Sequence, residues 1–241
     1  MPGVGLTNQS EHQMIPAFSP IELDRLSGCL ARLISHVRLD SVAITGGVAM
    51  QLGMAGLGRQ GPCRAIADLD LVAASIGAIT SSVVEQFLVS HYHVARPGVP
   101  KFMIQLVDPV SKIRVDVFPD LGGSLIDARP VAIREHAFQV LPLERIFEHK
   151  VQTLSRASPS APVDPKHARD ARALGDVLGR QVPGVAPGAL VPDVYGIKAE
   201  WPCDRCELSA HPGWPLAPKD RIFDLLGWSR QPNMSASAEV T

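Results

Sequence analysis

The sequence lacks any long apolar run, which excludes a membrane-spanning helix of ordinary length. No apolar stretch approaches the roughly 20 residues that a bilayer requires. Residues 1–18 contain no basic start followed by an apolar segment, so no secretory signal is expected. Cysteine is also scarce, with four in 241 residues, too few for a disulfide scaffold. We therefore expect a cytoplasmic protein with no membrane partner.

The chain also lacks a net charge of either sign. Lys and Arg number 23 and Asp and Glu number 24, giving a formal net charge of −1. This balance provides no global attraction to nucleic acid or to an anionic membrane, although a local basic patch is still allowed. Apolar residues make up 46%, enough for a substantial core.

Changes of pattern along the chain predict an α+β protein in four parts. These are a flexible tail over residues 1–18, a core with a mixed sheet over 19–142, a C-terminal helical region over 143–228 and a flexible tail over 229–241. Hydrophobic periodicity predicts the individual elements. Helices are expected at 20–38, 48–55, 79–90, 143–156 and 166–180, and strands at 41–45, 68–73, 91–95, 101–107, 112–118 and once or twice within 122–140.

Two aspartates two residues apart stand out in the segment DLDL. If this segment is a strand, Asp68 and Asp70 emerge on one face while Leu69 and Leu71 point into the core. Two like charges at this spacing repel, and a divalent cation such as Mg²⁺ would remove the repulsion. A pair of this kind alone is also common in solvated loops and helix caps.

A third acid lies in the apolar segment RVDVFP. Asp116 is flanked by Val115 and Val117, and a strand interior rarely carries an aspartate without a reason. If the two strands are neighbours, Asp116 converges with Asp68 and Asp70. Such a cluster suits phosphoryl transfer with two metal ions, Mg²⁺ or Mn²⁺, in which Asp116 bridges the metals or acts as a base.

The order of these motifs resembles the minimal nucleotidyltransferases of the DNA polymerase beta superfamily. The motifs are AITGGVAMQL, RAIADLDL and RVDVFP, in that order along the chain. Within the superfamily the chain is most similar to the AbiEii-like enzymes, which are the toxins of some bacterial toxin–antitoxin systems. The resemblance spans residues 43–178. It implies a nucleotidyltransferase fold, an NTP substrate and a cognate antitoxin as partner.

The resemblance also implies roles for residues outside the acidic cluster. Gly46 and Gly47 would bind the triphosphate through backbone N–H groups at a helix start. Arg64 would contact the triphosphate, Lys150 would bind nucleotide phosphates, and Asp170 would support the site. The alternatives are a solvated loop arginine, an ordinary surface lysine and a surface ion pair between Asp170 and Lys166.

One further motif does not belong to this pattern. Cys203 and Cys206 form a single Cys-x-x-Cys, with His211 nearby. A structural Zn²⁺ requires four ligands, and the segment supplies three. Two free thiols in a small loop module are the alternative to a zinc site.

These observations leave three functions open. The first is an enzyme that transfers NMP from an NTP to a hydroxyl on RNA, protein or a small molecule. The second is a catalytically silent nucleotidyltransferase fold that serves as a binding module. The third is a zinc-stabilised interaction protein built around the cysteine motif.

Overall fold

A computed structural model describes residues 17–61, 65–93 and 102–190. Its centre is a seven-stranded mixed sheet in the order β3-β4-β5-β2-β1-β7-β6. The strands are β1 (Val42–Thr45), β2 (Asp68–Ala73), β3 (Leu88–His93), β4 (Met103–Val107), β5 (Arg114–Pro119), β6 (Arg129–Ile133) and β7 (His136–Val140). The helices are α1 (Pro20–Leu33), α2 (Gly46–Gly56), α3 (Val83–Gln86), α4 (Leu143–Ser155) and α5 (Lys166–Leu178), with short 3₁₀ turns at Ile34–His36, Ile76–Ala78 and Ser124–Asp127.

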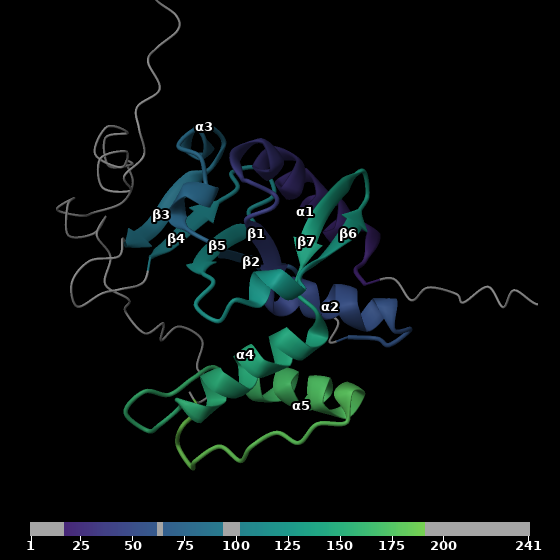
Figure 1. The fold of residues 1–241 in the computed structure, drawn as a ribbon, viewed down its shortest axis with the longest axis vertical. Helices are drawn as coiled ribbons and strands as arrows, with labels where there is room; N and C mark the ends of the chain where they lie inside the picture. The colour runs from purple at the N-terminus through teal and green to yellow at the C-terminus, as the bar shows by residue number, and fades with distance from the viewer. Residues whose placement is uncertain (1–16, 62–64, 94–101, 191–241) are drawn as a thin grey trace, which may run out of the picture.

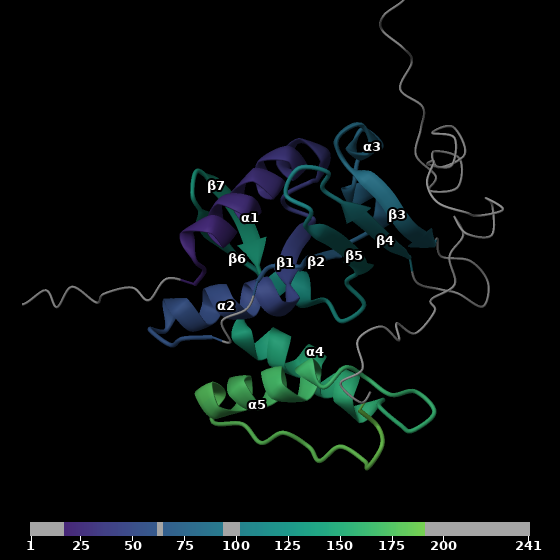
Figure 2. The ribbon, with the colours of Figure 1, turned by 180° about the vertical axis from the view of Figure 1, so that it is seen from behind.

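The predicted α+β class is confirmed, with helices flanking a mixed sheet (Figure 1). Seen from behind, α1 lies against one face of the sheet (Figure 2). On the other side, α2 contacts β1 and β2, while α4 contacts both α2 and α5. In both views α4 and α5 lie side by side, away from α1. Within the described ranges, no helix is both long and apolar enough to cross a bilayer.

Local sequence signals explain where α1 and α2 begin. The side chain of Ser19 accepts a hydrogen bond from the backbone N–H of Glu22, and Pro20 occupies the first turn of α1, as expected. The second helix begins at Gly46, directly after the buried strand β1. Gly46 has a φ of +66°, which an L side chain adopts only under strain.

The helix predicted over residues 79–90 is wrong. Only Val83–Gln86 is helical there, and Leu88–His93 forms the edge strand β3. The N–H and hydroxyl of Thr80 both donate to the carbonyl of His36, at 2.8 and 3.2 Å. These bonds fix the segment to the 3₁₀ turn that follows α1, in place of a helical turn.

One hydrophobic core joins the sheet to the C-terminal helices. Leu69, Leu71, Val115 and Val117 are fully buried between the strands and the helices. Phe147 of α4 belongs to the same cluster. The face of the sheet that carries the acids is therefore held at a fixed distance from α4 and α5.

Candidate functional site

The three predicted acids lie together on two neighbouring strands. Strand β2 pairs in parallel with β5, and Asp70 is the register partner of Asp116. Asp68 lies two residues before Asp70 and so occupies the same face of the sheet. The structure thus brings Asp68, Asp70 and Asp116 together from segments more than 40 residues apart.

Gly46 makes room for one of these acids. A Cβ atom placed on Gly46 would lie 2.0 Å from Oδ2 of Asp70, so any larger residue would collide with the carboxylate. The Asp70 side chain therefore lies over the first residue of α2, whose N-terminal N–H groups have no partner within the helix. Gly47 follows as the second residue of the same helix.

Asp70 is the least compensated of the three carboxylates. Its pKa is raised from 3.8 to about 7, chiefly by burial and then by the charges of Asp68 and Asp116, while Lys150 and Lys166 oppose the shift. No described residue forms a hydrogen bond or a close ion pair with its carboxylate. At neutral pH this group is poised between its charged and neutral forms.

Asp116 is more buried, with 5% of the residue exposed. Burial raises its pKa above the usual aspartate value, whereas the charge of Arg114 and a hydrogen bond from Gln105 lower it. Gln105 is the register partner of Asp116 on the other neighbouring strand, β4. The carboxylate is thus fixed from both sides within the sheet.

Arg114 joins two of the acids, a role that the sequence analysis missed. Its Nε lies 3.1 and 2.9 Å from Oδ1 and Oδ2 of Asp116, and Nη2 lies 3.0 Å from Oδ2 of Asp68. Arg114 precedes Asp116 by two residues and is the register partner of Asp68. The spacing within RVD was a visible signal, but the contact with Asp68 depends on strand pairing.

Helices α4 and α5 bring further cations to the acids. Lys150 is 8% exposed and its Nζ lies 2.9 Å from Oδ2 of Asp170, which is 1% exposed. The alternatives of a surface lysine and a surface Asp170 paired with Lys166 are therefore wrong. Instead, Nζ of Lys166 lies 3.8 Å from Oδ2 of Asp68.

His167 of α5 is a half-buried residue beside Lys150. Its Nδ1 lies 3.4 Å from Nζ of Lys150. Burial lowers the His167 pKa to about 4, and the charges of Lys150 and Lys166 contribute to this shift. A neutral imidazole at pH 7 can accept a hydrogen bond from the Lys150 ammonium, so His167 and Asp170 together orient this group.

The remaining predicted site residues lie outside the described ranges. These are Arg64 and the zinc-site candidates Cys203, Cys206 and His211. Their proposed roles therefore stay predictions.

The donor set fits a divalent metal in its chemistry but is not arranged around one. Carboxylate oxygens suit Mg²⁺ and Mn²⁺, and the uncompensated charge of Asp70 favours a cation beside it. Within the described part of the chain, however, no group of three Asp, Glu, His or Cys side chains is positioned to hold a metal ion. Asp68 and Asp116 are already bound to the Arg114 guanidinium.

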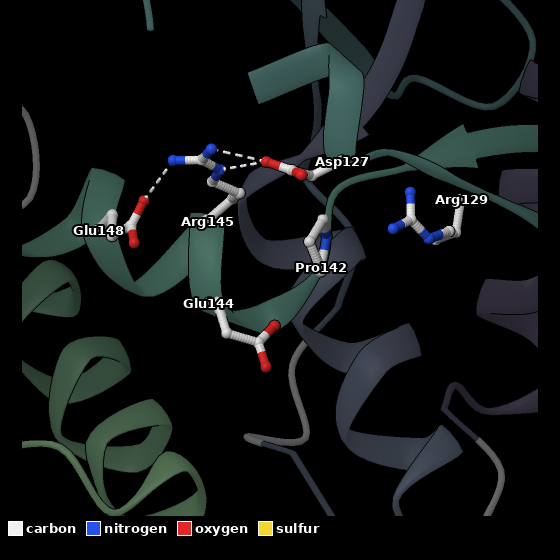
Figure 3. A pocket seen from close by; sticks show the side chains of 6 residues that line it. All are labelled: Asp127, Arg129, Pro142, Glu144, Arg145 and Glu148. Carbon is white, nitrogen blue, oxygen red and sulfur yellow. Dashed lines mark hydrogen bonds and ion pairs between the residues drawn. The ribbon is translucent and has the colours of Figure 1, made fainter. Parts of the chain in front are cut away.

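Two pockets flank α4, and neither is lined by the three acids. The first, of about 400 Å³, surrounds the start of α4 (Figure 3) and is lined by Asp127, Arg129, Pro142, Glu144, Arg145 and Glu148. Its Arg145 donates to Asp127 at 2.6 Å and to Glu148 at 2.8 Å, so both arms of the guanidinium are engaged. The second, of about 320 Å³, lies on the His149 side of α4 and also contains Asp120, Gln152 and Arg156. The carboxylate cluster is therefore identified by its charges and not by a deep cavity.

Comparison with solved structures finds nucleotidyltransferase-like proteins at low similarity. A nucleotidyltransferase-like protein from Paracoccidioides brasiliensis is 19% identical, with 66% of this chain and 78% of that chain covered at a TM-score of 0.38. TM1012 from Thermotoga maritima, described as a candidate nucleotidyltransferase, is 16% identical, with 70% and 98% covered at 0.41. JHP933 from Helicobacter pylori is 14% identical, with 66% and 68% covered at 0.38.

No family model matches the chain, and no curated relative matches it. TM-scores below 0.5 do not establish a common fold. The function proposed below therefore rests on the geometry of the site.

Proposed function

We propose that the chain is a metal-dependent nucleotidyltransferase that moves NMP from an NTP to a hydroxyl on RNA, protein or a small molecule. The observation that carries the proposal is the convergence of Asp68, Asp70 and Asp116 on paired strands, over the start of α2 at Gly46. Three acids lie together, and the pKa of both Asp70 and Asp116 is raised, an arrangement with no evident structural use.

Each element of the site has a part in this reaction. A divalent cation held by Asp68, Asp70 and Asp116 would neutralise triphosphate charge and lower the pKa of the acceptor hydroxyl. The N-terminal N–H groups of α2, at Gly46 and Gly47, would bind phosphate oxygens. Lys150, oriented by Asp170, adds positive charge on the α4 side.

The bond changes follow from nucleotidyl transfer itself. The acceptor oxygen forms a bond to the α-phosphorus while the bond between that phosphorus and the bridging oxygen breaks. Pyrophosphate leaves with its electron pair, and the acceptor proton passes to Asp116. A pKa raised by burial makes Asp116 a better proton acceptor than an exposed aspartate.

The test is incubation of the purified full chain with each α-labelled NTP, Mg²⁺ and total cell RNA. We expect label on RNA or on protein with the wild type and none with the double variant Asp68→Ala/Asp70→Ala. Asp176→Asn, which removes an exposed acid on α5, is the matched control and keeps full activity. Labelling that persists in the double variant would overturn the assignment.

A silent nucleotide-binding module is the second candidate, favoured by one observation. Arg114 already engages two of the three acids, and no described side-chain group is ready for a metal. This candidate predicts NTP binding that does not depend on Mg²⁺ and gives no transfer to any acceptor. Equilibrium dialysis with and without Mg²⁺ separates the two functions.

The AbiEii-like resemblance adds a toxin role to the first proposal. Such a toxin would arrest growth when expressed alone, and arrest would require the acids. Expression of the wild type and of Asp70→Asn in a bacterial host tests this directly. Equal growth of both strains would remove the toxin role and leave the transferase proposal intact.

A further inference from the structure

Arg114 occupies the space between two acids that the proposed reaction needs for metal. Its guanidinium binds both oxygens of Asp116 through Nε and one oxygen of Asp68 through Nη2, all at 2.9 to 3.1 Å. A planar guanidinium with several fixed donors matches carboxylates at this distance better than a lysine ammonium does. The same oxygens are the ones that a divalent cation would bind.

Among the described residues, none forms a hydrogen bond or close ion pair with the third acid, Asp70. Asp70 is pressed against Gly46 and receives no hydrogen bond from a described residue. The site therefore consists of a closed part, Asp68–Arg114–Asp116, and an open part, Asp70. This division explains why no described group of three ligands is positioned for a metal ion, although three carboxylates lie on one face.

We propose that Arg114 is an internal counterion that competes with the divalent cation for Asp68 and Asp116 and must leave them when metal enters. The inference rests on the proposed function, because it concerns the metal of that site. A guanidinium and a divalent cation that bind the same carboxylate groups repel each other, so each weakens the binding of the other. With 28% of its side chain exposed, Arg114 has a path toward solvent.

The competing role and a supporting role predict opposite effects on metal affinity. If Arg114 only orients the acids for metal, its removal disorders them and weakens metal binding. If it competes, its removal frees both carboxylates and tightens binding. The sign of the change therefore separates the two roles.

The experiment measures Mn²⁺ affinity of the full chain at pH 8 by electron paramagnetic resonance, with no nucleotide present. We expect Arg114→Gln to bind Mn²⁺ about tenfold more tightly than the wild type, equivalent to a tenfold lower Kd. Arg114→Lys keeps the charge but cannot bridge two carboxylates, so its Kd should lie between the two. If Arg114→Gln does not fold, the Arg114→Lys result decides the matter in the same direction.

Removal of any positive charge near the acids also strengthens cation binding there. A second variant must therefore measure this general effect. Lys166 lies 3.8 Å from Asp68 and is 37% exposed, but it does not bridge the acids. We expect Lys166→Gln to tighten Mn²⁺ binding by less than about threefold. If Lys166→Gln tightened Mn²⁺ binding as much as Arg114→Gln, the loss of a nearby positive charge would account for both changes. That result would overturn the inference.

The remaining outcomes distinguish this inference from the proposed function. Mn²⁺ binding that is unchanged or weaker in both Arg114 variants overturns the counterion role and leaves the metal-dependent function standing. No Mn²⁺ binding by the wild type or by any variant overturns the metal-dependent function, and the inference falls with it.

Discussion

The surroundings of Asp108 and of Asp70 shift the pKa of these two carboxyl groups in opposite directions. Asp108, in the turn between β4 and β5, is 0% exposed and accepts hydrogen bonds from the Arg32 guanidinium, from the Ser111 hydroxyl and from backbone N–H groups of Val110 and Ser111. Burial alone would raise the pKa of Asp108, but these donors hold it below the usual value. At the carboxylate site, by contrast, burial dominates and the pKa of Asp70 rises to about 7.

The difference teaches how a structural acid can be told from a functional one. Every oxygen of Asp108 has a donor, so the ion pair closes a turn and has no capacity left for a ligand. Asp70 is partly shielded from water and accepts no hydrogen bond from a described residue, so a nearby cation would stabilise its charged form. Burial of a carboxylate says little by itself, whereas the number of its donors decides the interpretation.

The largest expected effect is on catalysis at the open acid. Asp70→Asn should reduce NMP transfer by about 1000-fold or more, which is about 4 kcal/mol in the barrier. The urea midpoint should stay the same or rise, because the substitution removes repulsion among three acids. The transfer rate and the urea midpoint are measured on one preparation of Asp70→Asn. If this variant is unfolded, Asp70 has a structural role.

Substitution of Asp108 should have the opposite effect, a loss of stability without a loss of transfer. Asp108→Ala should lower the free energy of unfolding by about 3 kcal/mol, because it leaves the Arg32 charge and several N–H groups without their acceptor. Transfer per folded molecule should not change. Urea unfolding with an activity assay below the transition provides the measurement, and a loss under about 1 kcal/mol would contradict the comparison.

Two glycines with the same backbone angle test whether the open site requires close approach. Gly46 has φ +66° and Gly58 has φ +65°, but only the Gly46 position has Asp70 within contact distance. Gly58→Ala should destabilise by about 1 kcal/mol through backbone strain alone. Gly46→Ala should destabilise by about 2 kcal/mol and also reduce transfer, because Asp70 must move.

If both variants lose the same stability and the same activity, Gly46 serves only the backbone. The measurement is again urea unfolding with parallel transfer assays. Because the two substitutions are chemically identical, their difference isolates the contact with Asp70.

The stability contributions of Asp70 and Asp108 should also depend on pH in opposite ways. The folded-state pKa of Asp70 is raised, so its contribution favours folding below pH 3.8 and is lost as the pH rises to about 7. The stability of Asp70→Asn relative to the wild type should therefore increase between pH 4 and pH 7 and then level off. For Asp108, whose pKa is lowered, the stabilisation is present above pH 3.8 and is lost as the pH falls through the folded-state value.

Urea unfolding of the metal-free wild type and variants from pH 3 to pH 8 measures how the stability contribution of each aspartate changes with pH. A difference between Asp70→Asn and the wild type that shows no pH dependence would mean that Asp70 keeps an ordinary pKa in the folded chain.

Strand periodicity was sufficient to predict the acidic face. A period of two in DLDL and RVDVFP places the acids opposite Leu69, Leu71, Val115 and Val117, and the structure buries all four apolar residues. The apolar stripes of α4 and α5 likewise predicted those helices to within two residues at either end. These features depend on neighbours in the chain, which a sequence displays directly.

The contacts of Arg114 and Lys166 with Asp68 could not be predicted from such local patterns. Arg114 contacts Asp68 only because β2 and β5 pair in one particular register, and a shift by one residue would turn Arg114 to the opposite face. The contact of Lys166 with Asp68 depends on how α5 packs beside α4. Such long-range geometry carries no local signal, and the helix wrongly predicted over residues 79–90 failed for a related reason, its bonds to His36.

The parallel pairing of β2 with β5 also has a consequence for the order of folding. Asp70 and Asp116 are register partners but lie 46 residues apart, separated by β3 and β4, of which β3 pairs with β4 and β4 pairs with β5. Contacts of such long sequence separation form late, after local structure. The like charges therefore meet only once the apolar residues around them dock, and the hydrophobic pairs of β2 and β5 must overcome the repulsion at that step. The carboxylate site is thus assembled by the parts of the strands that face away from it.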